Sequence, residues 1–115
     1  MNLQMSLKKQ WFEMTKAGIK TEDYRDLNEY WISRLFYSGF MLEKGLNHVF
    51  LIKGRWYQQK PFTTNTMTLG YPLKTDTARI LKFKHEGIEI RTGVSEWGAE
   101  PDKLYFVIKH GERII

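Results

Sequence analysis

The residues best suited to chemistry lie in one short stretch, residues 18–25. Gly18 lets the chain turn sharply, and Lys20, Asp23 and Arg25 follow on a predicted turn and the opening of a strand. Two cations that flank a carboxylate can hold a phosphate or a base edge while the carboxylate orients them or accepts a proton. Because strand alternation brings positions 23 and 25 to the same side, we expect the three charged side chains to converge on one concave surface.

Each of these residues also has a simpler structural interpretation. Lys20 could be an exposed turn lysine, and Arg25 could pair with Glu22 or Asp23 and so fix the turn. Asp23 is the candidate proton acceptor, with Glu22 as its substitute, whereas paired acids on a turn are usually solvated. Tyr24 is a candidate contact for a bound base.

Two further aromatic residues are candidates for substrate binding. Trp97 lies between Glu96 and Gly98 on a predicted loop, where a large ring is costly to expose unless it packs or stacks. Tyr71, which follows Gly70, is similar, since its ring could stack on a base. Core packing is the alternative for both rings.

The net charge of +5 is unevenly distributed along the chain. Between Lys53 and Arg91 there are eight basic and three acidic residues, which accounts for the whole surplus. Such an excess favours a polyanionic partner through counterion release. Trp56 and Tyr57 also alternate with basic residues, as in proteins that bind single strands. The predicted nucleic-acid surface consists of Lys53, Arg55, Lys82 and Lys84. The alternatives are a solvated basic sheet face and a loop that covers a barrel.

Composition excludes several kinds of site. The chain has no cysteine, which excludes disulfides, thiolate zinc sites and a cysteine nucleophile and suits a reducing cytosol. His48, His85 and His110 are scattered without partners at metal-ligand spacing, so we expect no metal. With no Gly-rich phosphate loop we expect no cofactor. The chain lacks an apolar run of about 18 residues, so we expect a cytoplasmic protein without a membrane partner.

The pattern of the 115 residues predicts a single α+β domain. Alternation over residues 2–7 predicts a strand, and Ser6 is the expected N-cap of a helix from about Leu7 to Ala17. A second, deeply packed helix is expected from Asp26, with Glu29 completing a capping box, to about Ser38. Further strands are predicted over residues 47–53, 63–69, 77–91 and 103–109, with a polar loop over 55–61, while residues 21–25 form a short strand or an extended turn. The glycine at 86–87 marks either a hairpin or a bulge, and we expect the bulge. On the last strand, apolar residues at 104, 106 and 108 should share one face. We expect a closed or nearly closed barrel of about five or six strands flanked by the two helices.

Gly18-x-Lys20-x-x-Asp23-x-Arg25 resembles the signature Gly-x-Lys-x-x-Glu-x-Arg of the ASCH family, with Asp23 in the Glu position. The resemblance to small bacterial and phage-borne members continues on both sides and covers most of residues 1–115, except an apparent insertion at about residues 40–62. The further matching segments are residues 7–12, 30–31, 70–71, 87–90, 92–93, 96–101 and 105–108.

The resemblance implies a PUA-like β-barrel with two main flanking helices, with the signature lining a cleft beside the first helix. Family members are thought to bind RNA, so an RNA, nucleotide or nucleoside partner is implied. Some members cleave single-stranded RNA, and one branch removes the acetyl group of acetylated cytidine with a Lys, a Thr and a Glu. Lys20 matches that Lys and Glu96 is the candidate for the Glu, but Asp23 stands where the Thr is required and has no hydroxyl group.

Three functions therefore remain open. The first is a module that binds RNA or a nucleotide in the cleft. The second is a hydrolase acting on RNA or a modified nucleoside, with Lys20, Asp23 and Glu96 in its chemistry. The third is an interaction protein that uses residues 40–62 as its surface.

Overall fold

The computed structural model describes residues 1–37 and 49–115, which form an α+β structure made mostly of strands. These residues divide into two compact units. The first unit combines Met1–Asp26 with Phe62–Ile115, and the second unit is Leu27–Pro61. The predicted end of the second helix at Ser38, the start of the strand at Asn47, His48 and the first part of the expected insertion lie outside the described residues. No helix in the described part of the chain is long and apolar enough to cross a membrane.

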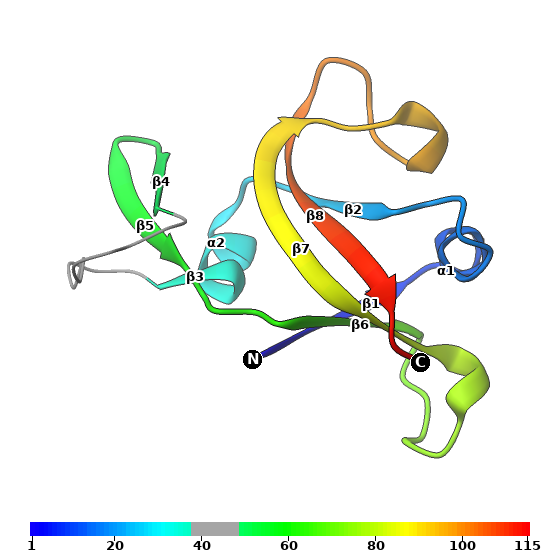
Figure 1. Ribbon diagram of the computed structural model, residues 1–115. Helices are drawn as coiled ribbons and strands as arrows, with labels where there is room; N and C mark the ends of the chain where they lie inside the picture. Colours follow the sequence, from blue (N-terminus) through cyan, green and yellow to red (C-terminus); the bar gives the residue numbers. More distant parts are fainter. Residues whose placement is uncertain (38–48) are drawn as a thin grey trace. The chain divides into compact units, whose positions relative to one another are not determined.

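The first unit is built on a five-stranded sheet that curls like half of a barrel (Figure 1). Its strand order is β1-β6-β7-β8-β2, with β1 parallel to β6 and every other pair antiparallel. The strands are β1 (Asn2–Leu7), β6 (Thr64–Leu69), β7 (Ile80–Thr92), β8 (Leu104–Arg113) and β2 (Glu22–Arg25). Of the closed or nearly closed barrel that we expected, the described strands form a curled sheet that is not closed, because β1 and β2 are the two ends of the order and form no ladder with each other.

The first helix starts later than the sequence predicted. Leu3, Met5 and Leu7 are buried in strict alternation, and Ser6 pairs with Thr68 in the ladder of β1 with β6. Ser6 is therefore extended in the sheet and cannot be the N-cap, which is Lys8, and α1 spans Lys9–Lys16. The predicted end of α1 is confirmed, since Ala17 is its C-cap and Gly18 follows with a φ of 77°.

The predicted bulge in β7 is confirmed. Leu81 is buried at an odd position and Ile88 at an even one, so the alternation must slip by one residue between them. The pairing of β7 with β8 shifts register on either side of His85, and Gly87 has a φ of 127°. The strand begins at Ile80 rather than at position 77, because residues 77–79 form a 3-10 turn.

Strand β8 is buried on both faces, not on one. The four residues from Tyr105 to Ile108 are all buried, whereas Leu104 is exposed. Phe106 and Ile108 lie on the face that carries Asp23 of β2, while Val107 pairs with Tyr24. Tyr105 and Val107 form a second small core with Ala99 and Tyr24. The segment between β7 and β8 covers this second face, which the apolar pattern of β8 alone did not predict.

The second unit contains α2 (Glu29–Leu35) and a sheet of order β3-β5-β4. The N-cap of α2 is Asn28 and not Asp26 as predicted. The side chain of Asn28 accepts a hydrogen bond from the Trp31 amide. The helix ends at Leu35 and not at about Ser38 as predicted, because Phe36 becomes extended and pairs with Gln59. Only one side of α2 is packed, because Ile32 and Leu35 are buried whereas Tyr30 is exposed.

The predicted loop over residues 55–61 is also wrong. Residues Arg55–Gln59 form strand β5, which pairs with β4 (Val49–Ile52) and with β3 (Phe36–Tyr37). Lys53 and Gly54, both at positive φ, make the tight turn between β4 and β5. The chain therefore forms a β-hairpin where its polar composition indicated a loop.

Candidate functional site

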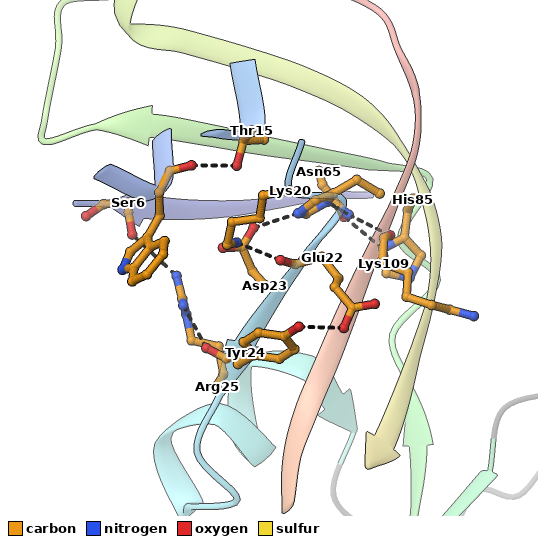
Figure 2. Close-up of polar contacts among 12 residues, drawn as sticks. Ser6, Thr15, Lys20, Glu22, Asp23, Tyr24, Arg25, Asn65, His85 and Lys109 are labelled. Atoms are coloured by element: carbon orange, nitrogen blue, oxygen red, sulfur yellow. Dashed lines mark hydrogen bonds and ion pairs between the residues drawn. The ribbon is translucent and has the colours of Figure 1, made fainter. Parts of the chain in front are cut away.

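Lys20 and Asp23 meet inside the first unit. Their side chains form an ion pair, and the Lys20 ammonium also donates a hydrogen bond to the backbone oxygen of Glu22 at 2.6 Å. Lys20 is 3% exposed and Asp23 is 2% exposed. Figure 2 shows both side chains pointing toward each other from the turn and from β2. The pair is thus a buried ion pair and not the exposed turn lysine of the simpler interpretation.

The Asp23 carboxylate also belongs to a chain of polar groups that are buried except for the half-buried His85. Its second oxygen lies 2.6 Å from Nε2 of His110 on β8. Nδ1 of His110 lies 2.8 Å from the amide nitrogen of Asn65 on β6, and the amide oxygen of Asn65 lies 2.7 Å from Nδ1 of His85 on β7. We call these five residues, from Lys20 to His85, the buried polar chain. It joins four strands of the sheet through their side chains.

The burial of Asn65 explains why its side-chain amide needs hydrogen-bond partners in the buried polar chain. Asn65 is completely buried and pairs with Leu3 of β1 and Phe83 of β7 on the core face. A buried amide without partners is unfavourable by about 1–3 kcal/mol. His85 and His110 face each other across β7 and β8 because the register shifts there, and both reach Asn65.

The hydrogen bonds also fix which imidazole nitrogen of His110 carries a proton. The amide nitrogen of Asn65 donates to the backbone oxygen of Lys109 at 3.2 Å, which sets the orientation of the amide group. The same nitrogen can only donate to His110, so Nδ1 of His110 is the acceptor and Nε2 donates to Asp23. Asp23 therefore accepts hydrogen bonds on both of its oxygens.

The buried polar chain shifts the protonation equilibria at its charged end. Burial alone would raise the pKa of Asp23, but the hydrogen bond from His110 and the charge of Lys20 outweigh it and lower the pKa to about 2. Burial lowers the pKa of Lys20, and the Asp23 carboxylate opposes part of that shift. Perturbed carboxyl and amine groups side by side occur in catalytic sites and also in structural ion pairs.

Glu22 and Tyr24 belong to a second network on the opposite face of β2. The Tyr24 hydroxyl donates to Glu22 at 2.8 Å and accepts from the amide of Val94 at 2.8 Å. Arg91 of β7 donates to Glu22 at 2.5 Å and to Glu89 at 3.0 Å. Burial, with a contribution from Glu22, raises the pKa of Tyr24 above its usual range. This network holds the segment after β7 against β2.

Arg25 is half-buried and connects the two ends of the curled sheet. Its guanidinium donates to the backbone oxygen of Ser6 on β1 at 3.3 Å and to that of Tyr24 at 2.8 Å (Figure 2). Arg25 thus shares its face of β2 with Asp23 and reaches across to the other edge strand. The structure brings Lys20 and Asp23 together, with Arg25 beside them at the edge.

The other candidates lie apart from the buried polar chain. Glu96 is exposed on a 3-10 turn, where it accepts a 3.3 Å hydrogen bond from Ser95, and Trp97 on the same turn is half-buried. Within residues 1–37 and 49–115, no hydrogen bond or ion pair joins Glu96 to Lys20 or Asp23. Tyr71 is 97% exposed on the loop after β6.

Lys82 and Lys84 lie on an exposed face of the sheet that is otherwise uncharged. Thr66 pairs with Lys82 and Thr64 with Lys84, while β1 contributes Asn2 and Gln4 beside the two threonines. The side chain of Asn2 accepts hydrogen bonds from both threonine hydroxyls, at 2.8 and 2.9 Å, so these groups share one face. We call Asn2, Gln4, Thr64, Thr66, Lys82 and Lys84 the polar face. It contains no acidic residue, and Lys84 pairs with the exposed Glu112 at its border at 3.1 Å.

Sequence reasoning missed Asn65, His85 and His110 as members of one network. The histidines were judged by metal-ligand spacing along the chain, which says nothing about pairs that meet across strands. Within the described residues no group of three His, Asp or Glu side chains is placed to hold a metal ion. The available signal was Asn65, a polar residue at a core-facing position of a strand.

Comparison with family models, with curated proteins and with solved structures gives no match for this chain.

Proposed function

We propose that this chain is an RNA- or nucleotide-binding module of the ASCH type on a PUA-like fold. The observation that carries the proposal is the polar face, which presents hydroxyl, amide and ammonium groups on three adjacent strands without a carboxylate among them. The ammonium and amide groups among them are usual donors to phosphate and sugar oxygens, whereas the hydroxyls of Thr64 and Thr66 already donate to Asn2 and can only accept from a ligand. The family resemblance of the sequence supports the same class of ligand.

The charges of the polar face are available to a ligand. Lys82 has no acidic partner among the residues that the structure describes. The pair of Lys84 with Glu112 joins two side chains that are more than half exposed, and such surface pairs contribute little stability. A phosphate group can therefore replace Glu112 with little loss.

Within the signature, Arg25 is the candidate for direct contact with the ligand, because its guanidinium is only half-buried. Lys20 and Asp23 act indirectly in this proposal. Their buried ion pair fixes the start of β2, from which Arg25 extends.

The test is a titration of a short single-stranded RNA at several salt concentrations. We expect the logarithm of the binding constant to fall linearly with that of the salt concentration, by about 0.7 per phosphate contacted. Replacing both lysines, Lys82→Gln and Lys84→Gln, should reduce that slope by about 1.4 if each contacts one phosphate.

A matched control removes two charges elsewhere. Lys9→Gln with Lys16→Gln on the exposed side of α1 lowers the net charge equally but leaves the polar face intact. The control should keep the wild-type slope nearly unchanged. Equal losses in the two double variants would reduce the effect to net charge, and no RNA binding at low salt would refute the proposed function.

A hydrolase acting on RNA or a modified nucleoside is the second candidate, favoured by the lowered pKa values of Lys20 and Asp23. It requires the substrate to reach a Lys20 ammonium that is buried and hydrogen-bonded to two acceptors. Incubation of the protein with RNA and with acetylated cytidine, followed by product analysis, tests it. Turnover that Lys20→Met abolishes, in a variant that remains folded, would establish the hydrolase in place of a binding module.

A further inference from the structure

The second unit presents a β-hairpin whose tip carries two cations. Strands β4 and β5 are joined by Lys53 and Gly54 alone, and Ile52 pairs directly with Arg55. The two turn residues have φ values of 50° and 78°, the pattern of a tight type I′ turn. Asn or Gly is usual at the first position of this turn. The sequence therefore places a lysine where the backbone conformation disfavours it, and Arg55 follows directly.

One face of the hairpin is apolar and exposed. Leu51 and Trp56 are direct cross-strand partners, so their side chains lie on the same face. Leu51 is 56% exposed and Trp56 is 52% exposed. The opposite face is packed, since Ile52 and Tyr57 are buried. An indole supported by a neighbouring leucine and open to solvent is a platform for stacking a base.

The charged residues of the hairpin and of the residues just after it have one sign. Residues 49–61 contain three basic residues and no acidic residue. The third of these, Lys60, is occupied within the unit, since it donates to the backbone oxygen of Ser33 at 2.9 Å and lies over the ring of Tyr37. Lys53 and Arg55 are exposed and, among the described residues, make no ion pair. Lys53 at the turn therefore lies next to the exposed aromatic face, whereas Arg55, the cross-strand partner of the buried Ile52, lies on the other face of the hairpin.

We infer that the β4–β5 hairpin is an RNA-contacting element in which Trp56 stacks on an unpaired base and Lys53 at the turn contacts an adjoining phosphate. This inference rests on the proposed function and assigns it a site in the second unit. The partner is single-stranded RNA, because bases in a duplex are stacked on one another and cannot stack on an indole. The cation at the turn, in a segment without an acidic residue, complements a phosphate backbone, whereas the apolar pair alone would not distinguish RNA from protein.

Two variants of the full-length protein separate binding from folding. Lys53→Asn suits the positive φ of the turn and removes one charge, so it should preserve or raise the melting temperature. It should reduce the salt slope of RNA binding by about 0.7. Trp56→Ala should weaken binding about 5- to 150-fold, which corresponds to the loss of one stacked base.

Fluorescence gives a direct readout of stacking. Titration with a short single-stranded RNA should quench tryptophan emission in the wild type, and Trp56→Phe should remove most of the quenching while it retains much of the affinity. Tyr30→Ala is the matched control, because Tyr30 is an aromatic residue of the same unit with a similar exposure, 59%, on α2. It should leave both quenching and affinity within about twofold. The same RNA annealed to its complement should bind more weakly.

The outcomes distinguish the two levels of the proposal. If the wild type binds no RNA, the proposed function fails. If it binds RNA but Lys53→Asn and the two Trp56 variants behave as wild type, the hairpin inference is overturned while the proposed function stands. Loss of binding to anionic lipid vesicles, and not to RNA, in these variants would also overturn it. If Trp56→Ala does not fold, Lys53→Asn and Trp56→Phe still decide the result.

Discussion

The buried polar chain and the polar face occupy opposite faces of the same sheet and use their charges differently. In the buried polar chain, the ammonium of Lys20 and the carboxylate of Asp23 are bonded to each other and to fixed neighbours. On the polar face, Lys82 and Lys84 stand among neutral groups at the surface. The charges of the buried polar chain are paired inside the fold, whereas the charges of the polar face can pair with a ligand.

The comparison shows that the residue types and spacing of a short motif do not say how its side chains act. The signature contains Lys20, Asp23 and Arg25, and the first two are among the most buried polar residues of the described chain. Residues with no signature, such as Thr66 and Lys82, form the more accessible surface. Substitutions in the buried polar chain should therefore change mainly the stability of the fold, whereas substitutions on the polar face should change mainly ligand binding.

The largest expected effect follows removal of the Asp23 carboxylate. Asp23→Ala leaves the Lys20 ammonium buried without its partner and His110 without its acceptor. We expect the free energy of unfolding to fall by about 3–5 kcal/mol in chemical denaturation. The double variant Lys20→Met and Asp23→Leu should recover much of the loss, because it removes both buried charges. A loss below about 1 kcal/mol in Asp23→Ala would mean that the pair contributes no more than a surface pair.

Acid should destabilise the protein through the same carboxylate. Because the folded state lowers the pKa of Asp23 from 3.8 to about 2, the ionised form stabilises the fold above about pH 4. This contribution, roughly 2 kcal/mol, should be lost as the pH falls from about 4 to about 2. Denaturation curves over this range should be less pH-dependent for Asp23→Asn than for the wild type. Equal slopes would show that other carboxyl groups control acid unfolding.

Neighbouring positions on β6 allow a closer comparison of the two faces. Asn65→Ala should lower the free energy of unfolding by about 1–3 kcal/mol, because it leaves His85 and His110 without the amide between them. Thr66→Ala removes one hydroxyl from the polar face and should change it by less than about 0.5 kcal/mol. Thermal melts of the two variants under identical conditions would test this order, and its reversal would count against the assignment of the faces.

The smallest effect on stability is expected for the lysines of the polar face. Lys82→Gln and Lys84→Gln together should change the free energy of unfolding by less than about 0.5 kcal/mol, since Lys84 loses only a surface pair with Glu112. Denaturation of this double variant should therefore superimpose on that of the wild type. A large destabilisation would mean that the lysines support the sheet, and their effect on RNA binding would then need another explanation.

The sequence was sufficient for features that depend on local pattern. Alternation predicted β1, and the interruption of the next-to-last strand at Glu86 and Gly87 led to the predicted bulge. Glycine at position 18 marked the end of α1. The two predicted N-caps were wrong. Ser6 pairs with another strand in the sheet, and Asn28, close to the expected Asp26, caps α2.

The features that depend on contacts distant in sequence were not predictable. Asp23 and His110 are 87 residues apart and meet only because β2 pairs with β8. The second face of β8 is buried by a segment whose own pattern gave no sign of it. The hairpin at Lys53 and Gly54 was missed because the polar residues after it favoured a loop, whereas the turn conformation is seen only in the backbone.

The measurement that separates the two faces most directly is an amide chemical-shift map of the protein during titration with a short single-stranded RNA. The exposed groups are proposed to bind and the buried polar chain to support the fold. Within the five-stranded sheet, the largest shifts should therefore occur at Thr64, Thr66, Lys82 and Lys84, with little change at Asp23 and His110. Large shifts confined to Lys20, Asp23 and His110, with the polar face unchanged, would contradict this assignment and place the ligand at the buried polar chain.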